Sequence, residues 1–340
     1  MYTICILYDK GDIWGLFDRV LGGMQYFSVC GVIGVGMEKM DYLKQGDRVA
    51  LAAPARAVSR EEMAPAIAML EGWGLQVVVP EGLYEMEGQL AGSDGHRTTL
   101  LQRLLDDADI RAIFCCRGGY GTVRIVDRLD YSRLAEHPKW IVGYSDITVL
   151  HSHIHRLLGL PTLHAVMPIN MHGEETPATR TLHDFLFGID GDFVDYEWAP
   201  TALNRAGTAH AEVVGGNLSI LYSLLGSPSQ VDTRGKILLI EDLDEYLYHI
   251  DRMMLGLKRA GMLEGLAGLM VGGLTDMHDN TVPFGRTAEQ IVLDAVAEYR
   301  YPVCFGTPFG HLGDNNLAIP LGVKCSLEVS NSKKCRIFAP

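Results

Sequence analysis

Short apolar runs and helical patterns alternate along the chain from residue 46 onward. Strands are predicted at 46–54, 75–80, 111–116 and 139–142, and helices between them at 61–73, 96–106 and 122–129. Strands and helices that alternate in this way predict a parallel sheet with right-handed crossovers. Such sheets bind ligands beyond the carboxyl ends of their strands, so we expect a site in the loops that follow them.

The pattern changes after about residue 165, and aromatic and acidic side chains are mixed over 184–198. The elements predicted beyond this point are a half-buried strand at 208–214, a helix at 218–225, a buried strand at 236–240 and a helix at 246–257. We therefore expect an N-terminal α/β domain over 40–185, a linker over 186–205 and a C-terminal domain over 206–340.

Residues 1–39 differ from the rest of the chain. Charged residues break their apolar pieces, so they contain neither the core of a signal peptide nor a run long enough to span a membrane. Glycines at 31, 34 and 36 lack the spacing of a dinucleotide fingerprint. We interpret 1–39 as an extension of unknown role, for which a mis-assigned start is one explanation.

Composition and charge narrow the possible partners. The 340 residues are 48% hydrophobic and carry a formal net charge of −13, which predicts a globular protein that repels the phosphates of nucleic acid. The seven cysteines have no C-x-x-C spacing, which argues against a zinc site and favours a reducing compartment. Small molecules or peptides are the expected partners, with no nucleic acid and no membrane.

The segment 140–150 is the main candidate for a catalytic site. An apolar strand ends at Gly143, Ser145 follows in a turn, and an apolar-periodic helix begins directly afterwards. A turn of this kind exposes a serine hydroxyl beside free backbone N–H groups that can bind an oxyanion. Serine followed by aspartate is also an ordinary helix start. Ser145 is thus a candidate nucleophile, and we expect it to cap the helix as well.

A glycine-rich loop follows the strand predicted at 111–116. Its sequence, Arg117-Gly-Gly-Tyr-Gly121, allows the backbone to approach a ligand and direct N–H groups at negative charge. Arg117 could hold a carboxylate of the substrate, and a structural salt bridge is the alternative role for it. The alternative is a tight turn in which the glycines only satisfy backbone geometry, but the nearby serine turn favours a functional role.

A serine nucleophile needs a base and a carboxylate that orients the base. Among the 12 histidines, His311 is the best candidate because it lies in a glycine-rich loop between apolar segments. His278, in a polar loop, is an alternative. Glu241 follows four apolar strand residues, which is a costly position for a charge without a partner. Ser145, Glu241 and His311 follow the chain order of α/β-hydrolases.

Three other histidines invite a different interpretation. His151 and His155 share one face of the predicted helix and could pair on a metal ion, but no third ligand or H-E-x-x-H pattern accompanies them. His249 lies in a predicted helix and is interpreted as a packing or surface residue. No metal and no cofactor are expected.

Five motifs follow one another along the chain. They are Arg117-Gly-Gly-Tyr-Gly121, Gly143-Tyr-Ser-Asp146, Gly215-Gly-Asn-Leu218, Leu239-Ile-Glu-Asp242, and Phe309-Gly-His311 with Asp314-Asn315. In this order they resemble the muramoyl-tetrapeptide LD-carboxypeptidases, a family of serine peptidases that includes the microcin-immunity peptidases. The resemblance runs from about residue 46 to the C-terminus. It implies a Rossmann-like N-terminal domain, a C-terminal β-rich domain of swivelling-barrel type, a site between them and a homodimer.

The resemblance also implies residue roles. Ser145 would be the nucleophile, His311 the general base and acid, and Glu241 the residue that orients His311, with Asp242 as the alternative carboxylate. The oxyanion would be bound by the backbone N–H of Asp146 and by one N–H of the Gly118–Gly119 turn, for which Gly119 is the first candidate and Gly118 the alternative. Substrate would contact Arg117 and Gly118.

The implied activity is that of a cytoplasmic LD-carboxypeptidase that removes the terminal D-alanine of murein tetrapeptides in cell-wall recycling. A microcin-immunity-type peptidase, which cleaves peptidyl-aminoacyl nucleotide analogues, is the second hypothesis. The candidate triad argues against a non-catalytic sugar- or peptide-binding protein. The missing glycine fingerprint argues against a dinucleotide-dependent oxidoreductase.

Overall fold

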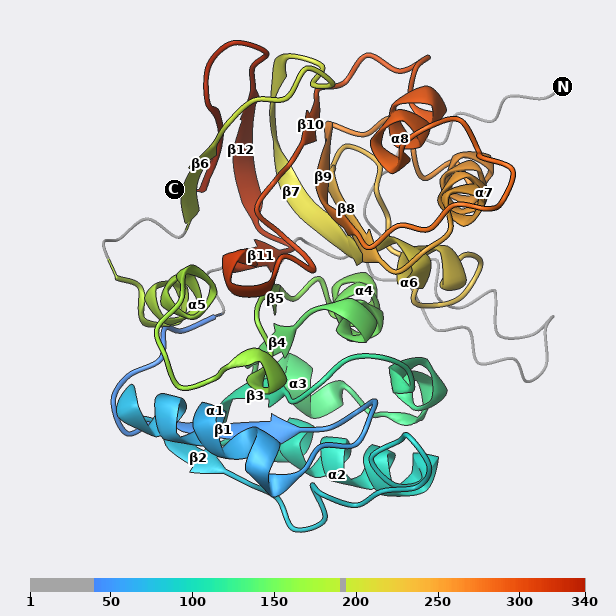
Figure 1. The fold of residues 1–340 in the computed structure, drawn as a ribbon. Coiled ribbons are helices and arrows are strands. Elements are labelled where there is room, and N and C mark those ends of the chain that lie inside the picture. Colours follow the sequence, from blue (N-terminus) through green and yellow to red (C-terminus); the bar gives the residue numbers. More distant parts are fainter. Residues whose placement is uncertain (1–39, 190–193, 340) are drawn as a thin grey trace, which may run out of the picture. The chain divides into compact units, whose positions relative to one another are not determined.

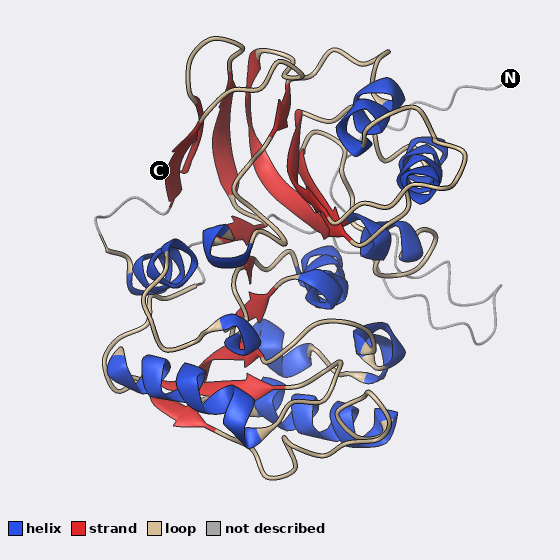
Figure 2. Ribbon diagram, viewed as in Figure 1, coloured by secondary structure: helices blue, strands red, loops and turns tan. Residues whose placement is uncertain are grey.

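The computed structural model describes residues 40–189 and 194–339, so the interpretation of residues 1–39 lies outside the described part. The described residues all belong to one compact unit. Two β-sheets with their helices build this unit (Figures 1 and 2). Within the described ranges, no helix is both long enough and apolar enough to span a bilayer.

The first sheet, as far as the chain is described, has six strands in the order β11-β5-β4-β3-β1-β2. The strands are β1 (Arg48–Ala52), β2 (Gln76–Val78), β3 (Ile110–Cys115), β4 (Trp140–Gly143), β5 (Thr162–His164) and β11 (Ile319–Leu321). β1 to β5 run parallel, which confirms the parallel α/β sheet predicted from the sequence. β11 pairs with β5 in the antiparallel direction, so the C-terminal part of the chain supplies an edge strand.

Helices and short 3₁₀ turns connect the strands of the first sheet. The helices are α1 (Arg60–Gly72), α2 (Asp94–Asp106), α3 (Ser132–Glu136), α4 (Thr148–Leu158) and α5 (Pro177–Phe187), and the turns are η2 (Thr122–Arg124), η3 (Val126–Arg128), η4 (Ser145–Ile147) and η5 (Pro168–Asn170). Capping explains where α1 and α2 begin. Ser59 and Glu62 form a capping box at α1, and Ser93 caps α2.

The helix predicted at 122–129 is wrong. The segment forms the two 3₁₀ turns η2 and η3, separated by Ile125 with φ of −118°. The segment contains four β-branched residues, which lose rotamer freedom in a helix: Thr122, Val123, Ile125 and Val126. Such a short segment therefore gains little from forming an α-helix.

The second sheet has the strand order β10-β9-β8-β7-β12-β13-β6. Its strands are β6 (Val194–Trp198), β7 (Gly207–Asn217), β8 (Ile237–Leu243), β9 (Gly268–Thr275), β10 (Val303–Phe305), β12 (Lys324–Val329) and β13 (Cys335–Ala339). β7 to β10 are parallel, whereas β12, β13 and β6 extend the sheet in antiparallel fashion. The associated helices are α6 (Leu218–Ser223), α7 (Leu247–Arg259) and α8 (Ala288–Ala295), with the turn η6 (Gly313–Asn315). This sheet confirms a second, strand-rich part of the fold. β6 falls within the predicted linker, and the domain boundaries themselves remain a prediction.

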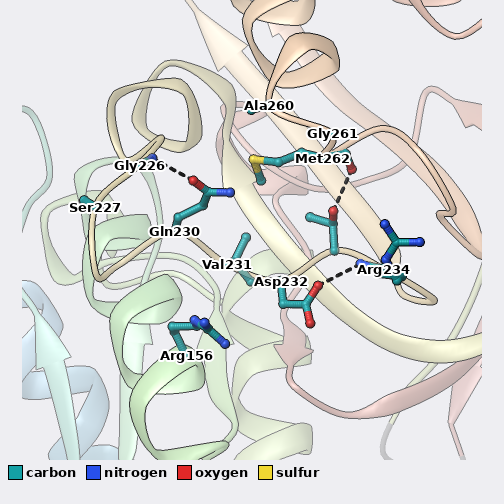
Figure 3. Close-up of a pocket in the computed structure, with 11 residues that line it drawn as sticks. Arg156, Gly226, Ser227, Gln230, Val231, Asp232, Arg234, Ala260, Gly261 and Met262 are labelled. Carbon is teal, nitrogen blue, oxygen red and sulfur yellow. Dashed lines mark hydrogen bonds between the residues drawn. The ribbon is translucent and has the colours of Figure 1, made fainter. Parts of the chain in front are cut away.

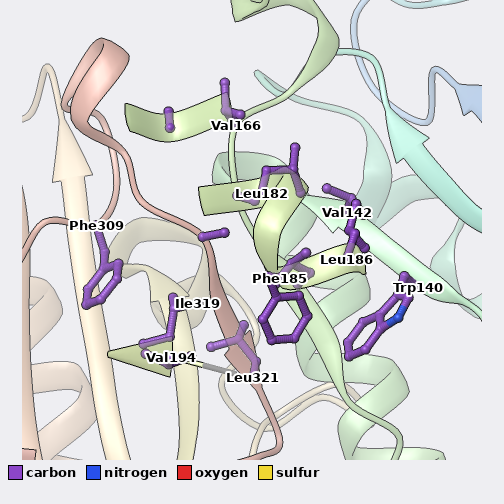
Figure 4. Packing of buried hydrophobic residues seen from close by; sticks show 14 of the residues in the cluster. Trp140, Val142, Val166, Leu182, Phe185, Leu186, Val194, Phe309, Ile319 and Leu321 are labelled. Carbon is purple, nitrogen blue, oxygen red and sulfur yellow. The ribbon is translucent and has the colours of Figure 1, made fainter. Parts of the chain in front are cut away.

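One buried apolar cluster joins the two sheets. It contains Phe114 of β3 and Leu239 of β8, together with residues of the segments that connect them. Figure 4 shows part of this cluster, in which Phe185 lies beside Trp140, with a ring-centroid distance of 5.1 Å. Phe309, just before His311, belongs to the same cluster and is fully buried. The shared core therefore holds the loops at the ends of both sheets in a fixed relation.

Candidate active site

Ser145 directly follows β4 and has a left-handed backbone conformation. Its φ is 62°, which is uncommon for residues other than glycine, and it opens the turn η4 that leads into α4. A strained turn between strand and helix is the setting of an exposed nucleophile. No side chain caps either η4 or α4. The prediction that Ser145 caps the helix is therefore wrong, because the residue lies within the turn instead of before it.

His151 supports the serine turn from within α4. Its Nε2 lies 2.9 Å from the carbonyl oxygen of Gly143, and burial lowers the pKa of the ring to about 4. The neutral imidazole donates its proton to that carbonyl, which ties the end of β4 to the helix that follows it.

Glu241 and His311 form a hydrogen-bonded pair. Glu241 lies near the end of β8 and is fully buried, and its Oε2 is 2.6 Å from Nδ1 of His311. With a proton on Nδ1 donated to the carboxylate, the other ring nitrogen, Nε2, is free to accept a proton. The pair thus has the arrangement of a general base held by an orienting carboxylate.

The surroundings of His311 favour its protonated form. Burial by itself lowers the pKa of the imidazole, but the hydrogen bond and negative charge of Glu241, helped by the charge of Asp242, outweigh it and raise the pKa above its ordinary value. The Tyr144 ring lies 4.8 Å from the His311 ring, centroid to centroid. Carboxylate and aromatic ring together fix the plane of the imidazole.

Ser145 and His311 line the same cavity, which has a volume of about 450 Å³. Its walls come from both sheets and include the loop after β3, the serine turn, Asn217 at the end of β7 and the segment 242–245. In the described part of the molecule, no hydrogen bond joins Ser145 to His311. Catalytic hydrogen bonds often form only when substrate is bound, so Ser145 and His311 can act as a pair without one in this structure.

Gly118 lies directly against the candidate nucleophile. A Cβ atom at this position would be 3.1 Å from Ser145 Oγ and 3.3 Å from the backbone nitrogen of Asp146. The space beside the Asp146 N–H exists because residue 118 has no side chain. An oxygen atom of a substrate could occupy that space, as the predicted oxyanion site requires.

Asp242, the alternative carboxylate, has other partners than His311. Its oxygens accept hydrogen bonds from Asn217 Nδ2 at 2.9 Å and from the backbone N–H groups of Ser219 and Leu243. Burial, with the charge of Glu241 beside it, raises the pKa of Asp242 to about 6. The residue that hydrogen-bonds to His311 is Glu241, and Asp242 braces the loop behind it.

The Asp146 side chain has a structural role and not one in proton transfer. It is buried, and its Oδ2 accepts a hydrogen bond of 2.9 Å from the N–H of Thr122. Burial raises the pKa of this carboxyl despite that hydrogen bond. The side chain thereby connects the serine turn to the end of the glycine-rich loop.

Arg117 lines the cavity and also forms an ion pair with Glu62, with an N–O distance of 3.7 Å. Three of the other histidines have their own acidic partners. His155 lies 3.6 Å from Glu212, His249 contacts Glu245 at 2.5 Å, and His278 contacts Asp244 at 2.5 Å. No cluster of three or more potential metal ligands occurs among the described residues.

Several residues at the cavity were not singled out from the sequence. Arg56, Ser219, Asp244 and Glu245 all line it. Asp244 and Glu245 directly follow β8, the strand that contains Glu241, so their position after a strand could have indicated them. Arg56 lies four residues beyond β1, in the first of the loops where a ligand was expected.

A second cavity, of about 400 Å³, is formed by the segments 226–234 and 260–262 with Arg156 (Figure 3). Its polar groups mostly serve the loop itself, since Gly226 N–H donates to Gln230 and Thr233 donates to the Met262 carbonyl. Its lining includes none of the candidate triad.

Comparison with known proteins agrees with the geometry. The model of the LD-carboxypeptidase N-terminal domain matches residues 49–165, and that of the LD-carboxypeptidase C-terminal domain matches residues 210–327. A probable murein peptide carboxypeptidase from Bacillus subtilis is 38% identical, over 85% of this chain and 91% of its own length. The murein tetrapeptide carboxypeptidase of Pseudomonas aeruginosa is 30% identical, over 83% of this chain and 93% of its own.

Solved structures share the fold. A muramoyltetrapeptide carboxypeptidase from Oxalobacter formigenes superimposes with a TM-score of 0.78 at 24% identity, over 86% of this chain and 99% of that one. The microcin C7 self-immunity protein MccF, in complex with glutamyl sulfamoyl guanosine, superimposes with a TM-score of 0.76 at 21% identity, over 88% and 98%. From the two domain matches and the sequence identities, the chain belongs to the LD-carboxypeptidase family and is a serine-type peptidase.

Proposed function

We propose that this peptidase acts on murein peptides and releases their terminal D-alanine, with Ser145 as nucleophile, His311 as general base and acid, and Glu241 as the residue that orients His311. The observation that carries the proposal is the hydrogen bond of 2.6 Å between Glu241 and His311 at a cavity that Ser145 also lines. A carboxylate, a histidine and an exposed serine are the groups that serine hydrolases combine.

The reaction begins when substrate enters the cavity that Ser145 and His311 line. His311 Nε2 takes the hydroxyl proton as Ser145 Oγ attacks the carbonyl carbon before the terminal D-alanine. The C–N bond then breaks, and His311 returns the proton to the leaving amine. A water molecule then gives a proton to His311 and attacks the acyl-enzyme carbonyl carbon. The bond to Ser145 Oγ breaks, and His311 returns the proton to that oxygen. Throughout, the Glu241 carboxylate stabilises the transient imidazolium.

The carbonyl oxygen becomes negatively charged in both steps. We assign its stabilisation to the backbone N–H groups of Asp146 and Gly119, with Gly118 and Arg117 beside the substrate. The open space next to Gly118, which a Cβ would fill, supports this assignment. One such donor accelerates acyl transfer by about 10²- to 10³-fold.

Named relatives support murein peptides as the substrate class. The proteins of Bacillus subtilis and Pseudomonas aeruginosa are named for murein peptides, and both match most of this chain at 30% identity or more. The Escherichia coli microcin C7 self-immunity protein is more distant, at 23% identity. Cleavage of an aminoacyl nucleotide analogue is therefore the second candidate activity.

We also propose that the enzyme is a cytoplasmic homodimer with an N-terminal domain over 40–185 and a C-terminal domain over 206–340. The free, buried cysteines 115, 116, 304, 325 and 335 suit a reducing compartment. Light scattering on the purified protein tests the dimer, because a mass of one chain would contradict it.

Release of D-alanine from a murein tetrapeptide tests the proposed activity. We expect turnover by the wild type and a loss of about four or more orders of magnitude in Ser145→Ala. Ser223→Ala is the matched control, since Ser223 is exposed and donates only to the Ile220 carbonyl. Equal release by the wild type and Ser145→Ala would refute the proposal. Turnover of an aminoacyl sulfamoyl adenosine in its place would support the second activity.

A further inference from the structure

Arg56 is a cationic residue of the catalytic cavity with no role so far. Its backbone forms a β-bridge with Leu90, which anchors the loop after β1, and its half-buried side chain lines the cavity. The side chain lies on the backbone of Gly119, where an added Cβ would be 2.2 Å from Arg56 Cδ. The arginine is therefore held against the glycine-rich loop and does not extend freely into solvent.

The charge of Arg56 is not neutralised by a neighbouring side chain. Within the described residues, its guanidinium has no ion-pair or hydrogen-bond partner. Arg117, by contrast, is paired with Glu62. Among the acidic residues that line the cavity, Asp244 is paired with His278 and Glu245 with His249. In a protein with a net charge of −13, an unpaired cation in the cavity is a specific feature that favours an anionic group of the substrate.

Arg56 and the proposed nucleophile contact neighbouring residues of the glycine-rich loop. Its side chain packs on Gly119, and the adjacent Gly118 packs on Ser145, so both functional groups flank the same dipeptide. In a carboxypeptidase substrate, three bonds separate the scissile carbonyl carbon from the terminal carboxylate carbon, a span of about 4 Å. A hydrogen bond to a guanidinium adds about 3 Å. Arg56 and Ser145 both line the cavity that would hold this part of the substrate.

We propose that Arg56 binds the terminal carboxylate of the substrate and thereby restricts cleavage to the last peptide bond. This inference rests on the proposed carboxypeptidase activity and adds to it a residue that determines specificity. The planar guanidinium can donate two parallel hydrogen bonds to a carboxylate, whereas Arg117 remains engaged with Glu62.

Gly119 contributes to the position of the Arg56 side chain. Its φ of +100° and the contact with Arg56 both require a residue without a side chain. The Arg56 side chain thus packs on the backbone of Gly119, and this contact places the guanidinium next to the proposed oxyanion donor.

A pair of substrates that differ only at the terminus tests the inference. The tetrapeptide with a free D-alanine carboxylate is compared with the same peptide ending in D-alaninamide, in the wild type and in Arg56→Gln, Arg56→Lys, Arg117→Gln and Arg180→Gln. Arg180 is exposed and paired with Glu175, which makes Arg180→Gln the matched surface control. The measured quantity is the ratio of kcat/KM for acid over amide.

We expect the wild type to prefer the acid and Arg56→Gln to lower that preference by about 10- to 100-fold, mainly through KM for the acid. Arg56→Lys should restore part of the preference, because it keeps the charge but loses the paired hydrogen bonds. A residue that only supported the fold would reduce turnover of both peptides equally. Arg180→Gln should leave the ratio unchanged.

An unchanged ratio in Arg56→Gln would overturn the inference, as would a ratio that collapses in Arg117→Gln instead. Both results leave the proposed D-alanine release intact, provided that the wild type still releases it. If the wild type releases no D-alanine, the proposed function fails. Calorimetric binding of the two peptides to Ser145→Ala, with and without Arg56→Gln, then decides on carboxylate recognition by itself. Equal binding of acid and amide to Ser145→Ala would refute it.

Discussion

Alanine at position 118 should abolish most of the activity while leaving the fold intact. Gly118 does not have a left-handed φ, so alanine can adopt its backbone conformation. The added methyl group would point at the proposed nucleophile and at the proposed oxyanion donor. The change therefore tests the catalytic assignment without removing any polar group.

The size of the effect follows from three distances. The Cβ of alanine would lie 2.9 Å from Ser145 Cβ, 3.1 Å from Ser145 Oγ and 3.3 Å from the Asp146 nitrogen. Carbon atoms prefer separations of about 3.5–4.0 Å, so Ser145 and the methyl group must move apart by about 0.6 Å. Catalytic groups tolerate displacements of only about 0.5 Å. The methyl group also covers the Asp146 N–H, and loss of one oxyanion donor costs about 3–4 kcal/mol in the barrier.

The assay is D-alanine release from the tetrapeptide, with kcat determined separately from KM. We expect kcat of Gly118→Ala to fall by about 10²- to 10³-fold, and the free energy of unfolding to fall by about 1–3 kcal/mol at most. Gly95→Ala is the control, because its Cβ would meet only Ser93 Oγ at 3.9 Å and the position lies in α2. That variant should gain about 0.5–1 kcal/mol in stability and keep its kcat. A Gly118→Ala enzyme with near wild-type kcat would refute the oxyanion assignment.

Two further changes test the base and the core. Glu241 raises the pKa of His311, and the proposed base must be neutral to act, so activity is lost as the pH falls through that pKa. Glu241→Gln should therefore shift the acid limb of the kcat/KM profile to lower pH. An unshifted acid limb would contradict the pairing of Glu241 with His311. Phe309 is fully buried between the sheets, and Phe309→Ala should lower the free energy of unfolding by about 3–5 kcal/mol in denaturant titrations. The exposed Phe284 provides the control, since Phe284→Ala should change stability by less than about 0.5 kcal/mol, and equal effects of the two variants would refute the assigned burial.

Local patterns were sufficient to predict much of the first sheet. The apolar runs of β1, β3 and β4 are continuous because both faces of a parallel sheet are covered, and such runs are readable without a structure. The strand β11 could not be predicted in the same way, since residues 319–321 pair with β5, far away in the chain. Pairing of that kind depends on the packing of the whole core and leaves no local signal.

The candidate site was predictable in its residue types but not in its geometry. Glu241 was suspect because a charge after buried strand residues needs a partner, yet that partner, His311, lies 70 residues further along the chain. The sequence left Asp242 open as the orienting carboxylate, and the structure distinguishes the two because Glu241 hydrogen-bonds to His311 whereas Asp242 accepts hydrogen bonds from Asn217 and Ser219. The prediction that Ser145 caps the helix was wrong because Ser145 lies within the turn η4, and its φ of 62° could not be predicted from the sequence.

The position of the cavity explains how one fold can keep its chemistry while its specificity changes. Arg56 follows β1, Gly118 follows β3, Ser145 follows β4, and His311 follows β10, so the carboxyl ends of parallel strands from both sheets face one site. The shared core of Figure 4 holds these ends in place, and the loops beyond them carry the polar groups. Ser145, Glu241 and His311 belong to the motifs that resemble the family, whereas Arg56 lies outside all of them. On the proposed role of Arg56, a substitution in the loop after β1 would alter which end group is bound without disturbing either the proposed triad or the core.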